Sequence, residues 1–131
     1  MKTTRNVLIT NDEPSSVFLL SEFFKIYQLS KDDLYINSLV AYSGLEAKHV
    51  VENREDLDLV IMNWEMPKMS GIHATELIRE IRPDLPVLLY SAYVGNPVYE
   101  PLIKSYFDDS IPSPININSF TKIVDKYLLK K

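Results

Sequence analysis

The sequence predicts a doubly wound α/β fold in which five parallel strands alternate with five helices. Short apolar runs of strand length recur along the chain, and a longer segment with helical spacing follows each one. The third and fourth runs are almost continuously apolar, which is typical of central strands covered on both faces. The expected strands are Val7–Thr10, Ile36–Ala41, Leu57–Met62, Val87–Ser91 and Ser110–Ser113.

Apolar residues at helical spacing justify the first three helices. Pro14 suits the first turn of a helix, and Ser43 with Glu46 forms a plausible capping box for the second. The stripes that should face the core are Val17, Leu20, Phe24 and Tyr27 in the first helix, and Ala74, Leu77, Ile78 and Ile81 in the third.

The last two helices differ in how clearly the sequence defines them. Pro97 and Pro101 cannot both lie inside a helix, so we expect a short fourth helix that starts near Pro101. The fifth has a regular apolar stripe, and Asn118 is its expected N-cap. That stripe consists of Phe120, Ile123, Val124, Tyr127 and Leu128. Pro112 and Pro114 indicate that the fifth strand lies at a sheet edge, where a missing N–H is tolerated.

Composition narrows the function classes. The 131 residues fit one domain, which we expect to span residues 1–131, and 46% of them are hydrophobic. A net charge of −4 disfavours general nucleic-acid binding. The absence of Cys and the presence of only two His argue against disulfides and zinc sites. No apolar run approaches the roughly 18 residues of a membrane span, so we expect a cytoplasmic protein without a membrane partner.

Polar residues follow the predicted strands at the sheet edge where α/β folds gather their chemistry. They are Asn11, Asp12 and Glu13 after the first strand, Asn63 after the third, Ser91 after the fourth and Ser113 after the fifth. Together with the segments VLITNDEPSS, DLVIMNWEMPKMSG and IREIRPDLPVLLYSA, this pattern resembles the response regulator receiver family, whose fold is CheY-like and flavodoxin-like. The resemblance covers essentially the whole chain and implies the strand order 2-1-3-4-5.

The resemblance implies a phosphorelay function, from which this sequence departs. Receivers take a phosphoryl group from a histidine kinase onto an aspartate after the third strand, with magnesium held by that aspartate and by acids after the first strand. Here Asn63 stands at the acceptor position and Asn11 replaces the first acid. Asp12 is the retained acid, and we expect Glu13 to turn toward the start of the helix. One carboxylate is a poor magnesium site.

Three further positions complete the comparison with the family. Ser91 matches the switch hydroxyl residue, whereas Ser113 replaces the phosphate-binding lysine. Pro114 is retained at a position that commonly follows a cis peptide bond. Ser110 occupies the position at which many relatives have a mobile aromatic residue. The counter-charge for a phosphoryl group is therefore missing.

Structural roles are the simpler interpretation of several of these residues. Asp12 could cap the first helix, Ser91 and Ser113 could bond backbone groups, and Trp64 could pack at the rim of the pocket. The side chain of Glu65 is expected to be solvated, while Asp12 and the backbone carbonyl of Glu65 are weak candidates for holding Mg²⁺. No cofactor is expected to be obligatory.

The leading hypothesis is a degenerate receiver, or pseudo-receiver, that acts by protein contact without aspartyl phosphorylation. One alternative is a phosphorylation-responsive receiver with another acceptor, or with Asn63 engineered in place of an aspartate. Another alternative is a small-molecule-binding module that uses the vacated pocket. No arrangement of residues typical of catalysis is evident, so we expect no enzymatic activity.

Expected partners follow from the same resemblance. They are a histidine kinase or another signalling protein, with a homodimer through the face of the fourth and fifth helices as a further possibility. Aromatic residues crowd the fourth helix, where exposed side chains would favour an interface and buried ones a core role. These residues are Tyr93, Tyr99, Tyr106 and Phe107.

Overall fold

The computed structural model describes residues 2–129 and confirms the predicted α/β architecture. Its sheet has five parallel strands in the order β2-β1-β3-β4-β5. The strands are β1 (Thr3–Thr10), β2 (Leu34–Ala41), β3 (Leu57–Asn63), β4 (Val87–Ser91) and β5 (Asp109–Pro112). The helices are α1 (Pro14–Leu29), α2 (Gly44–Asn53), α3 (Gly71–Ile81), α4 (Glu100–Tyr106) and α5 (Ile117–Leu128).

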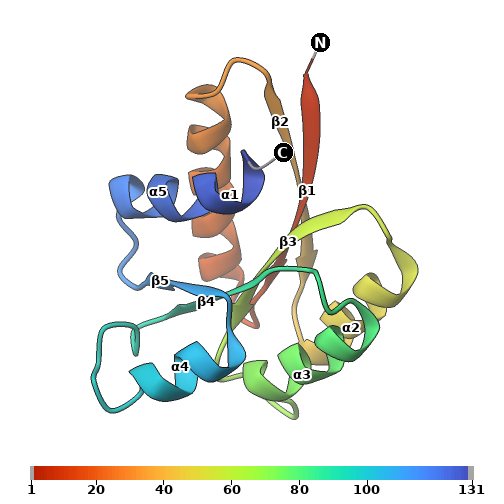
Figure 1. The fold of residues 1–131 in the computed structure, drawn as a ribbon, viewed down its shortest axis with the longest axis vertical. Coiled ribbons are helices and arrows are strands. Elements are labelled where there is room, and N and C mark those ends of the chain that lie inside the picture. Colours follow the sequence, from red (N-terminus) through yellow and green to blue (C-terminus); the bar gives the residue numbers. More distant parts are fainter. Residues whose placement is uncertain (1, 130–131) are drawn as a thin grey trace.

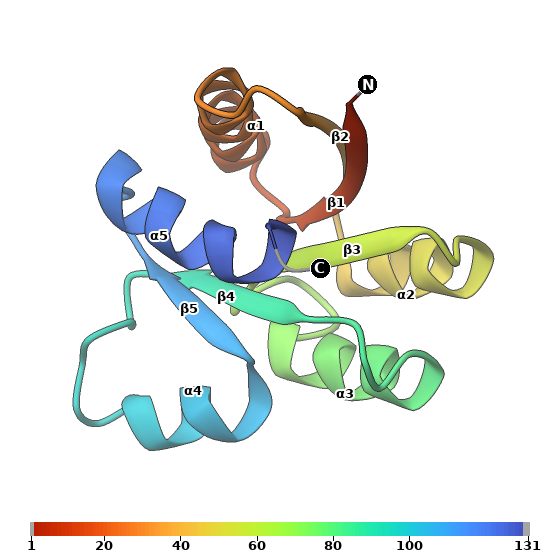
Figure 2. The ribbon, with the colours of Figure 1, turned by 45° about the horizontal axis from the view of Figure 1, so that its top comes forward.

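The helices cover both faces of the sheet. Figure 2 shows α1 and α5 on one face and α2, α3 and α4 on the other. Each face has its own apolar cluster: Phe24 and Phe120 centre the first, while Met62 and Ile78 belong to the second. The continuous apolar runs of β3 and β4 are therefore buried on both sides, as their position in the middle of the sheet requires.

Three strands begin earlier than the sequence pattern predicts, namely β1, β2 and β5. The first four residues of β1 are polar, yet Thr3 pairs with Leu34 and Asn6 with Asn37 across β2. Strand pairing requires only backbone hydrogen bonds, so the exposed end of a strand can be polar. An apolar pattern in the sequence therefore does not mark where such a strand begins. The edge position of β5 and the short α4 are confirmed, although β5 begins at Asp109 rather than at Ser110.

Helix starts follow local hydrogen bonding more closely than sequence pattern. The expected cap at Asn118 is wrong: the N-cap of α5 is Asn116, whose side chain accepts the N–H groups of Asn118 and Ser119. Ser43 caps α2 as expected. The carboxylate of Glu46 reaches the N–H of Tyr42 instead of closing the box on Ser43.

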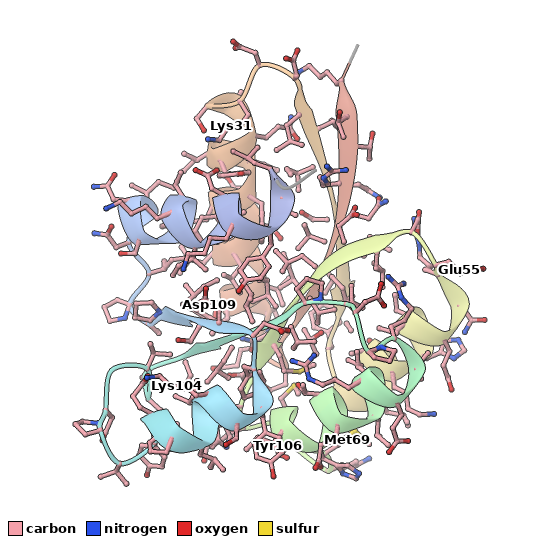
Figure 3. The ribbon with its side chains drawn as sticks, in the orientation of Figure 1. Lys31, Glu55, Met69, Lys104, Tyr106 and Asp109 are labelled. Atoms are coloured by element: carbon pink, nitrogen blue, oxygen red, sulfur yellow. The ribbon has the colours of Figure 1, made fainter. Side chains whose placement is uncertain are left out.

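Polar contacts tie α5 to the rest of the domain. The buried Tyr27 hydroxyl donates to Asp125 Oδ1 at 2.7 Å, and Lys31 Nζ lies 3.1 Å from the same oxygen. Asp109, labelled in Figure 3 at the start of β5, accepts from Lys126 and from the hydroxyl of Tyr127, each at 3.2 Å. Burial and the Asp109 carboxylate raise the pKa of Tyr127 to about 12. Among residues 2–129, no helix is both long and apolar enough to cross a membrane.

Candidate functional site

The carboxyl ends of β1, β3, β4 and β5 meet at one edge of the sheet (Figure 1). Thr10 pairs with Met62, Asn63 with Tyr90, and Ser91 with Pro112, so the strands end nearly level. The turns that follow them therefore converge, although they are far apart in the sequence. This convergence brings together the candidate site residues that the sequence indicated, of which all but Pro114 line one cavity.

The turn after β1 is built on Asn11. This residue is 2% exposed, and its Oδ1 accepts the N–H of Glu13 at 3.0 Å. Asp12 does not cap α1, because the N-cap residue is Glu13 and no side chain bonds there. Pro14 occupies the first turn, as expected. Glu13 lines the same cavity as Asp12, so its expected turn toward the helix start does not remove it from the site.

Asn63 connects this turn to the loop after β3. Its amide nitrogen Nδ2 donates to Asp12 Oδ1 at 3.1 Å and to the Glu65 carbonyl at 3.0 Å. Asn11 Oδ1 lies at 3.5 Å from the same nitrogen. Three oxygens surround this atom, which fixes the amide orientation, because the amide oxygen in the same place would face only other acceptors.

Gly71 packs directly against the backbone of Asn63. This first residue of α3 packs so closely that an added Cβ would lie 1.9 Å from the Asn63 carbonyl oxygen. Its N–H donates to the Trp64 carbonyl at 2.7 Å. No other residue type fits this approach, so the start of α3 fixes the end of β3.

Ser91 and Ser113 lie on the other side of the site, and hydrogen bonds connect their two segments. Ser91 Oγ accepts the N–H of Tyr93 at 3.0 Å. The Ser113 N–H donates to the Ser91 carbonyl at 3.1 Å, and the Ser113–Pro114 peptide bond is cis. Ser110 lies half-buried on β5 and does not line the cavity. Because this residue is a serine, the position that carries a mobile aromatic residue in many relatives has no aromatic side chain here.

A cavity of about 340 Å³ opens between these segments. Three of its lining residues are acidic and none is a lysine, arginine or histidine, so its walls are more negative than Asp12 alone would make them. The lining residues are Asn11, Asp12, Glu13, Ser16, Asn63, Trp64, Glu65, Tyr90, Ser91, Ala92, Tyr93 and Ser113.

Aromatic rings form one wall of the cavity and continue under α4. Trp64 makes edge contacts with Tyr93 and Tyr99, at centroid distances of 5.5 and 5.9 Å, and those two tyrosines stack at 4.3 Å. The exposed Glu65 is not merely solvated, because it accepts from the Tyr93 hydroxyl at 3.4 Å and its charge raises the pKa of Tyr93. Phe107 is buried, and the other rings are half-buried.

These contacts answer the question about the aromatic residues near α4. The core on the α3 side of the sheet is covered by three partly buried tyrosines, Tyr93, Tyr99 and Tyr106. Their main role is therefore to pack against this core. Leu102 on α4 and Val98 just before it are also exposed, and α1 carries four large exposed apolar side chains. They are Phe18, Leu19, Ile26 and Leu29.

Two lining residues were missed by the sequence reasoning. Ser16 lies in the first turn of α1, and Tyr90 precedes Ser91 at the end of β4. The signal that could have found Tyr90 is a hydroxyl-bearing side chain beside the strand end, in a strand that is otherwise aliphatic up to that point.

The model of the response regulator receiver domain family matches residues 7–125. The chain belongs to this family. It is a receiver domain of two-component signalling, a class of domain that also occurs within histidine kinases.

Relatives of this receiver domain are parts of larger proteins as well as single domains. The autoinducer 1 sensor kinase/phosphatase LuxN of Vibrio harveyi is 27% identical over 131 residues, covering 98% of this chain but only 15% of LuxN. The receiver domain of a Pseudomonas aeruginosa sensor histidine kinase, solved with magnesium in its active site cleft, superposes with a TM-score of 0.81 at 15% identity and covers 98% of this chain and 100% of its own. CheY in a CheX–CheY–BeF₃–Mg complex from Borrelia burgdorferi gives 0.78 at 24% identity, covering 96% and 90%.

The donor set of this receiver domain does not fit a resident magnesium ion. Magnesium needs oxygen ligands in octahedral array, yet the group at the acceptor position presents N–H donors to Asp12 and to the Glu65 carbonyl. In the described part of the chain, no group of three or more acidic, histidine or cysteine side chains is arranged to hold a metal. The two oxygens that sequence comparison proposed as weak ligands are instead hydrogen-bonded to Asn63.

Proposed function

We propose that this receiver domain signals by protein contact, without aspartyl phosphorylation. The observation that carries the proposal is the double hydrogen bond from the Asn63 amide to Asp12 and the Glu65 carbonyl. An amide has no anionic oxygen to attack phosphorus, and its nitrogen lone pair is delocalised. The same amide satisfies the oxygens that a cation would otherwise hold, so magnesium is not required for the folded site.

The charge of the cavity supports the same proposal. A phosphoryl group brings at least one further negative charge, and Asp12, Glu13 and Glu65 already line the cavity. The family's counter-charge is replaced by the neutral Ser113. Like charges within a few ångströms repel one another, and no lysine or arginine of the lining offsets this repulsion.

The outer face of α1 supports the contact role. Phe18 is 65% exposed and Leu29 is 83% exposed, on a helix whose opposite face is buried in the core. Exposed large apolar side chains on one helix favour a protein partner. A histidine kinase or another signalling protein is the proposed partner. We propose that the contact takes place in the cytoplasm and involves neither nucleic acid nor enzymatic turnover.

A homodimer through α4 and α5 remains a second proposal, for which Leu102 offers an exposed apolar side chain.

Intact-protein mass spectrometry tests the proposal. The chain and the Asn63→Asp variant are incubated with acetyl phosphate, with and without magnesium. We expect no phosphoryl mass on the unaltered chain. A stoichiometric phosphoryl mass on it would overturn the proposal and reveal another acceptor, the alternative that the sequence left open.

The variant separates two degrees of departure from the family. If only the Asn63→Asp variant gains a phosphoryl mass, then Asn63 is the one residue that prevents phosphorylation of the unaltered chain. Its absence from both chains shows that the missing lysine and the replaced acid also block the reaction. Both outcomes agree with contact-based signalling.

A further inference from the structure

β2 is an edge strand of the sheet and pairs with β1 along one side. Successive residues of a parallel strand turn their N–H and C=O groups alternately to one side and to the other. The carbonyl groups of Asp33 and Ala41 accept N–H groups at the two ends of β1, so the odd-numbered residues of β2 face β1. The even-numbered residues face outward, and Ile36 confirms this because its N–H donates to Gln28 Oε1 at 2.7 Å.

Side chains of the same molecule close this outer edge at both ends but not in the middle. The bond from Ile36 closes one end, and at the other end the N–H of Tyr42 donates to Glu46 Oε1 at 2.9 Å. Between them, the outward N–H and C=O groups of Ser38 and Val40 have no hydrogen-bond partner in the part of the chain that the structure describes. Ser38 is exposed and lines a groove of about 250 Å³ between α1 and β2, so α1 leaves this part of the edge open.

The open stretch of β2 is complementary to a second copy of itself. In an antiparallel pair of strands, two facing residues exchange both N–H···O=C bonds, and the next facing pair exchanges none. A two-fold axis at Leu39 places Ser38 of each copy opposite Val40 of the other. The open N–H groups of each copy then donate to the open carbonyl groups of the other. An axis at Ser38 would instead place Val40 opposite Ile36, whose N–H already donates to Gln28.

The composition of β2 allows two copies to approach each other. Edge strands are usually protected from pairing by a charged residue, a proline or a bulge. The sequence of β2, LYINSLVA, contains no charged residue and no proline, and its register with β1 is continuous. The other edge strand, β5, is protected, because it is only four residues long, begins with Asp109 and ends with Pro112. No like charges therefore face each other when two β2 strands pair, although the chain carries a net charge of −4.

We propose that two copies of this chain form a two-fold dimer in which their β2 strands pair antiparallel about Leu39, which joins the two sheets into one. The two Leu39 side chains then face each other on the side of the sheet where Leu39 already packs against the core. The half-exposed rings of Tyr35 and Tyr42 lie at the two ends of the open stretch, beside the facing strand. The contact is small, so the dimer dissociates on dilution. This interaction goes beyond the proposed function and does not depend on whether the domain can be phosphorylated.

Sedimentation equilibrium from about 10 µM to about 1 mM measures the dimer, whose mass should appear as the concentration rises. Ser38→Pro removes an open N–H group at an edge position, where a strand tolerates proline, and should weaken the dimer about tenfold or more. Ser38→Thr keeps the N–H group and should dimerise like the unaltered chain. Circular dichroism confirms that each variant is folded. A chain that stays monomeric at every concentration, or a folded Ser38→Pro variant that dimerises as tightly as the unaltered chain, overturns the proposal.

Disulfide cross-linking tests the position of the two-fold axis. The chain contains no cysteine, so a single introduced cysteine can cross-link only to a second copy. Facing residues that exchange no hydrogen bonds have Cα atoms about 4.5 Å apart, which a disulfide can span. Leu39→Cys should therefore cross-link on mild oxidation. Tyr35→Cys is the control on the same edge, because the two copies of that residue would lie roughly 27 Å apart. Cross-linking of Tyr35→Cys as efficient as that of Leu39→Cys overturns the proposal.

Two further measurements distinguish this dimer from one through α4 and α5. Leu102→Lys adds a charge to the exposed face of α4 and should leave the dimer unchanged. Loss of the dimer in Leu102→Lys, with Ser38→Pro still dimeric, places the interface on α4 and overturns the proposal. In the unaltered chain, hydrogen exchange at the N–H groups of Ser38 and Val40 should slow as concentration rises, whereas that of Ile36 should not change. Exchange at Ser38 and Val40 that is as fast in the dimer as in the monomer contradicts the pairing.

Discussion

The side-chain nitrogen of Asn63 lies 3.1 Å from Asp12 Oδ1, with the Glu65 carbonyl 3.0 Å away on the other side. An amide with two N–H groups is thus placed among oxygens that the family uses for a divalent cation. The receiver fold is retained around it. These hydrogen bonds connect the turn after β1 to the loop after β3.

Asn63→Asp should destabilise the domain in the absence of divalent cations. The change removes both donated hydrogen bonds and places a second carboxylate against Asp12, which should cost about 1–2 kcal/mol of unfolding free energy. Urea unfolding in EDTA measures it, and added Mg²⁺ should recover part of the loss.

Asn96→Asp is the matched control for that change. It adds the same charge on an exposed loop, where the side chain only accepts the N–H of Val98. An equal loss of stability in both variants would show that net charge, and not the Asn63 hydrogen bonds, is responsible.

Gly71→Ala should be among the most damaging small substitutions. The new methyl group would lie 1.9 Å from the Asn63 carbonyl oxygen, so either α3 or the end of β3 must move. We expect a loss of about 3 kcal/mol in urea unfolding. Gly95→Ala is the comparison, because no atom lies within 4 Å there and only its φ of +90° is unfavourable, which should cost about 1 kcal/mol. Similar losses at both positions would argue against the tight contact.

The fold was predictable because apolar runs and helical stripes directly reflect burial. Pro101 likewise limited α4, and the two-sided apolar character of β3 placed it centrally. The helix caps were less predictable. Asn116 and Asn118 are equally good caps by residue type, and only the path of the chain after Pro114 selects Asn116.

The site was predictable as a set of positions but not as a set of interactions. Strand ends identified Asp12, Asn63 and Ser91, since parallel strands bring their carboxyl ends together. The direction of the Asn63 amide depends on oxygens from two other segments, and no sequence pattern encodes it. The acidity of the cavity was underestimated, because Glu13 and Glu65 enter it from neighbouring loops.

Alkaline pH should weaken the attachment of α5 to β5. In the unfolded chain Tyr127 loses its proton near the ordinary pKa of 10, whereas in the folded domain the pKa is about 12. The unfolded state then binds fewer protons between these values, so stability falls as pH rises through that window. Urea unfolding from pH 9 to above pH 11 (about one unit either side of the ordinary tyrosine pKa) measures the slope.

Tyr127→Phe should make that slope shallower, because it removes one titrating hydroxyl along with its hydrogen bond to Asp109. Part of the slope should remain, since burial and Asp125 also raise the pKa of Tyr27. Tyr35→Phe is the control, since its half-exposed ring on β2 makes no hydrogen bond in the described part of the chain. A slope that is unchanged by Tyr127→Phe would contradict the assigned role of the Tyr127–Asp109 contact.

The most direct test of the central claim is a magnesium titration followed by NMR at the Asn63 side-chain amide. If this amide takes the place of the cation, its two N–H resonances stay unchanged while Mg²⁺ is added. In Asn63→Asp, the backbone amides around Asp12 and Glu65 should instead shift in a saturable manner. Saturable shifts of the Asn63 amide in the unaltered chain would show that magnesium displaces its hydrogen bonds, and would contradict the account.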